Sequence, residues 1–143
     1  MKLLILNGPN LNMLGIREPE IYGKQNYAAL CAFVQAAADE MGVSCEIFQS
    51  NHEGVLVDKI QEAYGKVDGI VINPAAYTHT SVAIADALSA VAIPTVEVHL
   101  SNVMEREAFR HHSFVAPVAQ KTYMGLGFEG YRRAIRYLAC GEK

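Results

Sequence analysis

The sequence predicts an α/β fold in which helices cover both faces of a parallel β-sheet. The first observation is the segment Lys2–Leu6, which is hydrophobic from Leu3 onward, as a strand buried on both faces must be. The second is the alternation of strand patterns with segments such as 27–41, where apolar residues recur at steps of three and four, as in a helix. Strands that alternate with helices form right-handed βαβ units and therefore a parallel sheet.

Five strands and five helical segments can be placed along the 143 residues. The helix over 27–41 stops at Gly42, and the helix over 128–139 is expected to turn Tyr131 inward. The remaining expected strands cover 43–48, 67–72, 94–99 and, more weakly, 115–119, and the remaining helical segments cover 55–64, 81–91 and, in part, 101–113. This order fits one domain over 1–143 with a flavodoxin-like, doubly wound fold, whose ligands bind at the carboxyl ends of the strands.

The composition excludes several classes of protein. The net charge is −3 and charged residues make up 19% of the chain, so there is no basic excess to bind nucleic acid. No apolar run reaches the roughly 18 residues that a membrane span needs, and the N-terminal apolar segment is too short for a signal peptide. The three cysteines, Cys31, Cys45 and Cys140, are far apart and are expected to be small buried residues in a reducing cytoplasm.

A long loop follows the first strand. It holds Arg17 and Tyr22 and is punctuated by Gly15, Pro19 and Gly23. A loop of this length is usually functional or disordered, and the apolar residues within it argue against disorder. We therefore predict a lid over about 15–24 that brings an arginine and a tyrosine over a pocket.

Histidines mark the carboxyl edge of the predicted sheet: His52, His79 and His99 lie on it or close to it. His99 closes the fourth strand, and alternation along a strand places Glu97 on the same face. A carboxylate beside an imidazole orients the ring and keeps it a competent proton donor near neutral pH. A partly buried ion pair without a chemical role would give the same pattern.

Tyr22 could act as a general base only if its pKa fell well below the free value of about 10. A nearby cation favours the phenolate, and Arg17, Arg106 and Arg110 are candidates for that cation. The alternative is a loop tyrosine that serves only for packing.

Asparagines stand at or just after strand ends, at Asn10, Asn12 and Asn73. Their amides could hydrogen-bond an enolate or a carboxylate, although asparagine is also common in turns for its tolerance of unusual backbone angles. The residues Thr78, Thr80 and Ser81 precede a helix, where capping explains at least one of them. Metal is not expected, because His111 and His112 lack zinc-type spacing, and the absence of GxGxxG disfavours a dinucleotide.

Six segments together resemble the type II 3-dehydroquinate dehydratases (3-dehydroquinases). They are Leu6–Asn12, Leu14–Gly23, Gln49–Gly54, Asn73–Ser81, Glu97–Asn102 and Arg106–Ser113, in the order of the family, and the likeness covers nearly the whole chain. The resemblance implies trans-dehydration of 3-dehydroquinate to 3-dehydroshikimate in the shikimate pathway, with no metal, cofactor or Schiff base. It also implies a homododecamer built from trimers.

The same resemblance implies catalytic roles for five residues. Tyr22 would be the base that removes the proton at C2, with Arg17 holding it as phenolate. Asn10 would stabilise the enolate, and His99 would protonate the departing C1 hydroxyl with Glu97 as its orienting partner. The implied substrate-binding residues are Asn73, Leu100 and Ser101 for the carboxylate, His79 and Arg110 for the ring hydroxyls, Arg106 for positive field, and Asp86 reaching into a neighbouring subunit's site.

Three other interpretations remain open on the residues alone. The chain could be an enzyme for another small polyhydroxylated carboxylate. A substrate screen would distinguish such an enzyme from a 3-dehydroquinate dehydratase. It could be a non-enzymatic module that binds flavin or phosphate, although this would not explain Arg17 and Tyr22 on one loop. It could also be a degenerate homologue retained for assembly.

Overall fold

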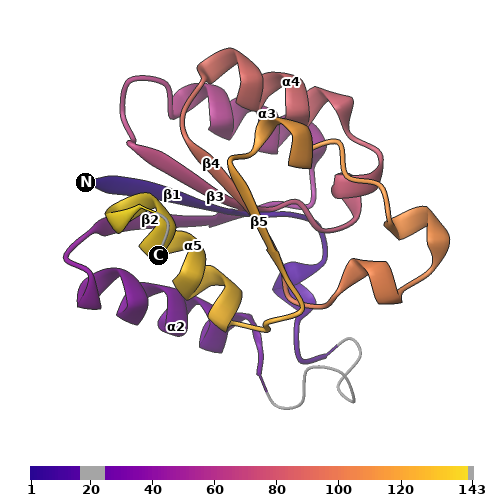
Figure 1. The fold of residues 1–143 in the computed structure, drawn as a ribbon, viewed down its shortest axis with the longest axis horizontal. Coiled ribbons are helices and arrows are strands. Elements are labelled where there is room, and N and C mark those ends of the chain that lie inside the picture. The colour runs from indigo at the N-terminus through magenta and orange to yellow at the C-terminus, as the bar shows by residue number, and fades with distance from the viewer. Residues whose placement is uncertain (17–24, 142–143) are drawn as a thin grey trace.

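The computed structural model of the chain describes residues 1–16 and 25–141, and these residues form a five-stranded parallel sheet in the order β2-β1-β3-β4-β5 (Figure 1). The strands are β1 (Lys2–Asn7), β2 (Ser44–Gln49), β3 (Gly69–Asn73), β4 (Thr95–His99) and β5 (Lys121–Met124). Because the chain winds outward from β1 in both directions, the switch point lies between β1 and β3. The predicted flavodoxin-like α/β fold is confirmed.

Four α-helices in the described ranges cover the sheet, two on each face (Figure 1). They are α2 (Tyr27–Glu40) and α5 (Glu129–Cys140) on one face, and α3 (Glu53–Glu62) and α4 (Val82–Val91) on the other. Side chains of β1 alternate between the two layers: Leu3 and Ile5 pack under α2 and α5, whereas Leu4 and Leu6 pack under α3 and α4. This two-sided burial explains why the strand reads as continuously apolar.

Two helices of the expected set begin at residues that cap them. The side chain of Asn26 accepts the Ala29 N–H at the start of α2, and Ser81 accepts the Ile84 N–H at the start of α4. The expectation that one of the polar residues before α4 is a cap is therefore confirmed. None of the helices in the described ranges is long and apolar enough to cross a membrane.

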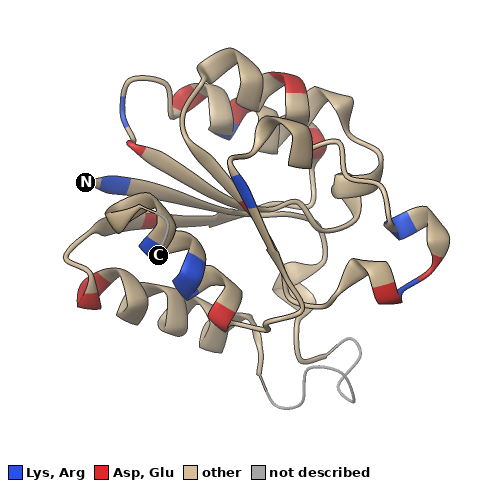
Figure 2. Ribbon diagram, in the orientation of Figure 1, with Lys and Arg blue, Asp and Glu red and all other residues tan. Residues whose placement is uncertain are grey.

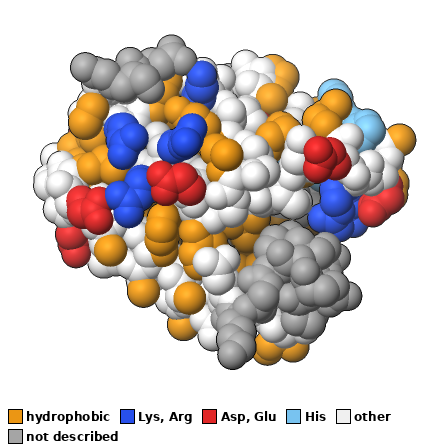
Figure 3. All heavy atoms as spheres, turned by 60° about the horizontal axis from the view of Figure 1, so that its bottom comes forward, with side chains coloured by type: hydrophobic (Ala, Val, Ile, Leu, Met, Phe, Trp, Pro, Cys, Tyr) orange, Lys and Arg blue, Asp and Glu red, His pale blue; other side chains and the backbone are white. Residues whose placement is uncertain are grey.

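An ion-pair cluster joins the two helices on the lower face in Figure 1. Arg132 of α5 binds Glu40 at the end of α2 and Glu129 in its own first turn. Figure 3 shows basic and acidic side chains standing together over this pair of helices. Since the side chains are partly exposed, these pairs contribute at most about 1 kcal/mol each.

The predicted fifth strand over 115–119 is wrong. This segment contains the 3₁₀ turn η5 (Ala116–Val118), and the strand follows at Lys121–Met124, where Val96 pairs with Lys121. Pro117 lacks a ladder N–H, and the N–H of Val115 is taken by the Ser113 hydroxyl. The apolar pattern has another cause, because Val115 is fully buried against the α3 and α4 layer.

The segment 101–113 is partly helical, as expected, and its helical parts are two short 3₁₀ turns, η3 (Val103–Glu105) and η4 (Ala108–Arg110). The expectation for the cysteines needs correction. The cysteines are not fully buried: Cys31 and Cys45 are half-buried and Cys140 is exposed. Cys140 is the last residue of α5, where the helix has passed the edge of the core.

Candidate active site

A cavity of about 260 Å³ opens at the carboxyl ends of β1, β3 and β4, beside the switch point. Eight of the residues singled out from the sequence line it: Asn10, Asn73, His79, His99, Leu100, Ser101, Arg106 and Arg110. Because parallel strands end at one edge, residues from three distant loops converge there. The structure thus brings together most of the predicted site.

His99 forms one wall of the cavity and is paired with Glu97. The Nε2 atom of His99 lies 2.7 Å from Oε2 of Glu97, and the two side chains are 6% and 0% exposed. The predicted pairing on one face of β4 is confirmed. With Nε2 held by the carboxylate, Nδ1 is the ring nitrogen that can exchange a proton with a ligand.

Glu97 is held by two further hydroxyl groups. Ser113 Oγ donates to Oε2 over 2.7 Å, and Thr122 Oγ1 donates to Oε1 over 2.9 Å. Ser113 Oγ also accepts the N–H groups of Val115 and Ala116, so its own proton is available for Glu97. Burial by itself raises the pKa of Glu97, but the hydrogen bonds from His99, Ser113 and Thr122 outweigh it and hold that pKa below its usual value.

The loop after β1 packs directly on the loop after β3. The N–H of Gly8 donates to the Asn73 carbonyl over 2.8 Å, and a Cβ on Gly8 would meet the Pro74 carbonyl oxygen at 2.4 Å. Only glycine permits this approach. It places the residues after Gly8 beside the residues after Asn73, on the same side of the cavity.

Asn10 adopts a left-handed backbone conformation with a φ of 70°, which asparagine tolerates better than most residues. Its N–H donates to Asn51 Oδ1 over 3.0 Å. Gln49 donates from Nε2 to the Gly8 carbonyl over 3.1 Å and to Asn12 Oδ1 over 3.3 Å. The end of β2 and the loop after it therefore brace the loop that carries Asn10, and Asn12 takes part in this brace and does not line the cavity.

Asn73 is oriented from below by a buried tyrosine. Its Nδ2 donates to the Tyr131 hydroxyl over 3.0 Å, and its Oδ1 accepts the Ala75 N–H over 3.1 Å. The Tyr131 hydroxyl in turn donates to Asn7 Oδ1 over 2.7 Å. Burial raises the pKa of Tyr131, so its hydroxyl stays protonated.

The segment with η3 and η4 supplies the cationic side of the cavity. Arg106 Nη1 donates to Ser101 Oγ over 3.4 Å, and Arg110 Nε pairs with Glu107 over 2.6 Å. Figure 2 shows charged positions of both signs on this segment. The hydrogen bond from Arg110 is the main reason that the pKa of the exposed Glu107 lies below its usual value. The His79 ring is fixed from the same side, with Nδ1 2.8 Å from the His112 carbonyl oxygen.

Several predicted site residues lie elsewhere. Arg17 and Tyr22 fall outside the described residues, as does most of the predicted lid. Asp86 is exposed on α4 and does not line the cavity. His52 precedes α3 and also does not line it. Within 1–16 and 25–141 there is no group of three histidine, cysteine or acidic side chains that could hold a metal ion.

The sequence patterns do not indicate three supporting residues. Thr122 lies in the strand that the sequence places elsewhere, and Ser113 belongs to a matching motif that gives no sign of its contact with Glu97. Tyr131 was expected to face the core, but nothing in its helical pattern showed that its hydroxyl reaches Asn7 and Asn73. A buried tyrosine usually finds a partner for its hydroxyl, which is the signal that could have found it.

The family model described as class II dehydroquinase matches residues 1–139. The chain belongs to this family. The resemblance drawn from the six segments is thereby confirmed, and with it the predicted class of enzyme, because relatives of this chain are named 3-dehydroquinate dehydratase or 3-dehydroquinase, which are hydro-lyases.

Two curated relatives and one solved structure illustrate the likeness. A 3-dehydroquinate dehydratase of Lachnospira eligens is 58% identical to this chain, over 94% of this chain and 93% of its own. A catabolic 3-dehydroquinase 1 of Aspergillus terreus is 55% identical over 99% of this chain and 93% of its own. The crystal structure of the type II dehydroquinase from Butyrivibrio crossotus is 54% identical, covers 96% of this chain and 97% of that one, and superposes with a TM-score of 0.94.

Proposed function

We propose that this chain catalyses the trans-dehydration of 3-dehydroquinate to 3-dehydroshikimate, with 1–143 as one catalytic domain. The observation that carries the proposal is the buried pair of His99 and Glu97 at a cavity lined by Asn10 and Asn73, in a chain of the class II dehydroquinase family. The reaction needs an acid for a departing hydroxyl and donors for an enolate. The cavity offers both types of group.

The first step is removal of a proton from C2, alpha to the ketone. Tyr22 is our proposed base, and Arg17 favours its phenolate form; both assignments come from the family motif, since these residues lie outside the described part of the chain. The electron pair of the broken C–H bond moves onto the ketone oxygen as an enolate. Asn10 stabilises this oxyanion, through a water molecule in our proposal, and a preorganised donor of this kind lowers a barrier by roughly 3–4 kcal/mol.

The second step is loss of the C1 hydroxyl. The enolate electrons return to form the C1–C2 double bond, and His99 gives its proton to the leaving oxygen, so that water departs. Glu97 keeps the imidazole in place and stabilises its charged form, as the 2.7 Å contact supports. Base and acid then bracket one ring from opposite sides, as a trans elimination requires.

The remaining cavity residues bind the substrate in this proposal. The Asn73 amide and the backbone N–H groups of Leu100 and Ser101 take the carboxylate. His79 and Arg110 bind the ring hydroxyls, and Arg106 contributes to the positive electrostatic potential of the cavity. Support comes from their common position on the cavity wall and from the anion-binding character of paired amides and guanidinium groups.

Assembly and location belong to the proposal as well. We propose a homododecamer in which Asp86 reaches a neighbouring subunit's site, which agrees with its exposed position on α4, outside the cavity of its own chain. Light scattering of the purified protein would test the mass of the assembly. Cell fractionation would test the expected cytoplasmic location.

The deciding experiment is an absorbance assay with 3-dehydroquinate, which follows the conjugated enone product in wild type, Tyr22→Phe and His99→Asn. We expect product with wild type and almost none with either variant. The matched control is Tyr64→Phe, because Tyr64 is a 68% exposed tyrosine in the turn after α3. Product that survives in Tyr22→Phe would remove the proposed base. A folded wild-type protein without product would favour an enzyme for another small carboxylate, to be sought by a substrate screen.

A further inference from the structure

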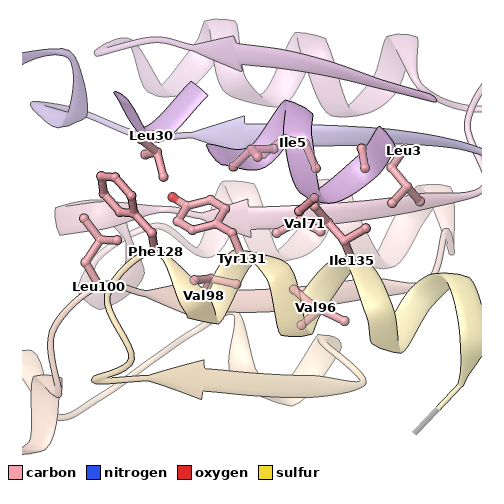
Figure 4. Close-up of a cluster of buried hydrophobic side chains, with 14 of the residues drawn as sticks. Leu3, Ile5, Leu30, Val71, Val96, Val98, Leu100, Phe128, Tyr131 and Ile135 are labelled. Carbon is pink, nitrogen blue, oxygen red and sulfur yellow. The ribbon is translucent and has the colours of Figure 1, made fainter. Parts of the chain in front are cut away.

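A directed chain of hydrogen bonds runs beneath the cavity, through the layer between the sheet and the helices α2 and α5. Asn73 donates to Tyr131, Tyr131 donates to Asn7, and Asn7 Nδ2 donates to the Tyr27 hydroxyl over 3.3 Å. Figure 4 shows Tyr131 rising from α5 among the apolar side chains of this layer. Asn7 and Tyr131 are fully buried and Asn73 is 3% exposed, so water cannot replace these partners.

The backbone N–H of Ala75, at the Asn73 end of the chain of hydrogen bonds, fixes which group donates in each bond. Because the Ala75 N–H donates to Asn73 Oδ1, the amide nitrogen of Asn73 must face the Tyr131 hydroxyl. That hydroxyl has a single proton, which goes to Asn7 Oδ1. Asn73 Nδ2 carries two protons, and only one is used by Tyr131. The other remains for a partner on the cavity side, where Asn73 forms part of the wall.

We propose that Tyr131 is a positioning residue of the dehydration reaction, which holds the Asn73 amide so that its second N–H points at the substrate carboxylate. The proposal rests on the proposed function, in which Asn73 binds that carboxylate. Tyr131 lies beneath the wall and does not line the cavity, so it acts only through Asn73. Without its hydroxyl, the Asn73 amide loses one of the two contacts that set its rotation.

The test compares Tyr131→Phe with Tyr137→Phe in the dehydration assay. Tyr137 stands on the same helix and packs against the same core, but its hydroxyl has no hydrogen-bond partner among the described residues. We expect Tyr131→Phe to raise KM about tenfold with a smaller change in kcat, since binding of substrate and transition state is lost alike. Tyr137→Phe should keep both constants within about twofold. An unchanged KM in Tyr131→Phe would overturn the proposal.

A double-mutant cycle separates positioning from general damage. If Tyr131 acts through Asn73, then Tyr131→Phe should change KM little in an Asn73→Ala background. A full additional effect in that background would show that Tyr131 acts by another route, against the proposal.

Amide exchange in wild type gives a readout that needs no variant and no turnover. The side-chain N–H protons of Asn73 should exchange with solvent far more slowly than those of the exposed Asn26, and one of them should shift when 3-dehydroshikimate is added. Fast exchange at Asn73 would contradict the hydrogen-bond chain even if Tyr131→Phe failed to fold. A wild-type protein with slow exchange but without dehydratase activity would reject the proposed function and leave the hydrogen-bond chain intact.

Discussion

The carboxylate of Glu97 lies 2.7 Å from Nε2 of His99, at the buried end of β4. Oε1 of Glu97 accepts one further hydrogen bond from the side chain of Thr122, and Oε2 accepts one from Ser113. A buried charge is costly unless it is fully hydrogen-bonded, and here two of the three partners, Ser113 and Thr122, come from outside β4. The tertiary structure therefore contributes to keeping this carboxylate ionised.

Replacement of Glu97 by glutamine should lower kcat for dehydration about 10- to 100-fold. The change removes a charge-assisted hydrogen bond of about 1.5–3 kcal/mol from the proposed acid. Steady-state assays of Glu97→Gln and of Glu62→Gln, an exposed glutamate of α3, would measure it. A wild-type kcat in Glu97→Gln would mean that the carboxylate does not support His99.

The stability of the protein should fall in acid partly through Glu97. Its folded pKa lies below its ordinary value of 4.5, so the folded state binds fewer protons than the unfolded state in this range. The contribution of the ionised carboxylate is complete above pH 4.5 and is lost as the pH falls through the folded pKa.

Urea unfolding of wild type and Glu97→Gln between about pH 6 and about pH 3 would measure this contribution. We expect the wild type to lose more free energy of unfolding over this range than the variant. Parallel profiles for the two proteins would rule out Glu97 as a source of the acid sensitivity.

Thr122→Val should destabilise the protein by about 1–3 kcal/mol, because it leaves Oε1 of the buried Glu97 without its hydroxyl partner at nearly unchanged volume. Thr122→Ser keeps a hydroxyl and should lose less free energy of unfolding than Thr122→Val. Thermal or urea unfolding of the two variants would measure the difference. Equal losses in both would point to packing of the threonine methyl group as the cause.

Gly8→Ala should destabilise the protein by about 1–3 kcal/mol or more, because the added Cβ would stand 2.4 Å from the Pro74 carbonyl oxygen. Relief of that overlap separates the loops after β1 and β3, so the rate of the dehydration reaction should fall as well.

The matched control for this change is Gly54→Ala in α3, where an added Cβ meets nothing within 4 Å. It should be neutral or stabilising by up to about 1 kcal/mol, since alanine favours the helix. Urea unfolding of both variants gives the comparison. A Gly8→Ala protein as stable as wild type would show that the two loops can separate without cost.

Much of the fold could be predicted from local patterns. Leu3 to Leu6 are apolar without interruption because β1 is covered on both faces, and the pattern of 27–41 encodes α2 to within a residue or two. The fifth strand could not be placed in this way. Lys121–Met124 is short and only half-buried at the edge of the sheet, so it has no strong apolar pattern, whereas Val115 is buried outside any strand.

The sequence by itself determined the alternation of strands and helices, the edge at which polar loops gather, the pairing of Glu97 with His99 and the family to which the chain belongs. The alternation and the pairing follow from residues close in the chain, whose spacing fixes which face they share, whereas the family follows from the six segments that resemble it. Only the tertiary structure decided that Thr122 reaches Glu97 and that Tyr131 reaches Asn7, across 25 and 124 positions. Such partners are chosen by the packing of whole elements, which no local period records, and this packing sets the charge and orientation of the proposed catalytic groups.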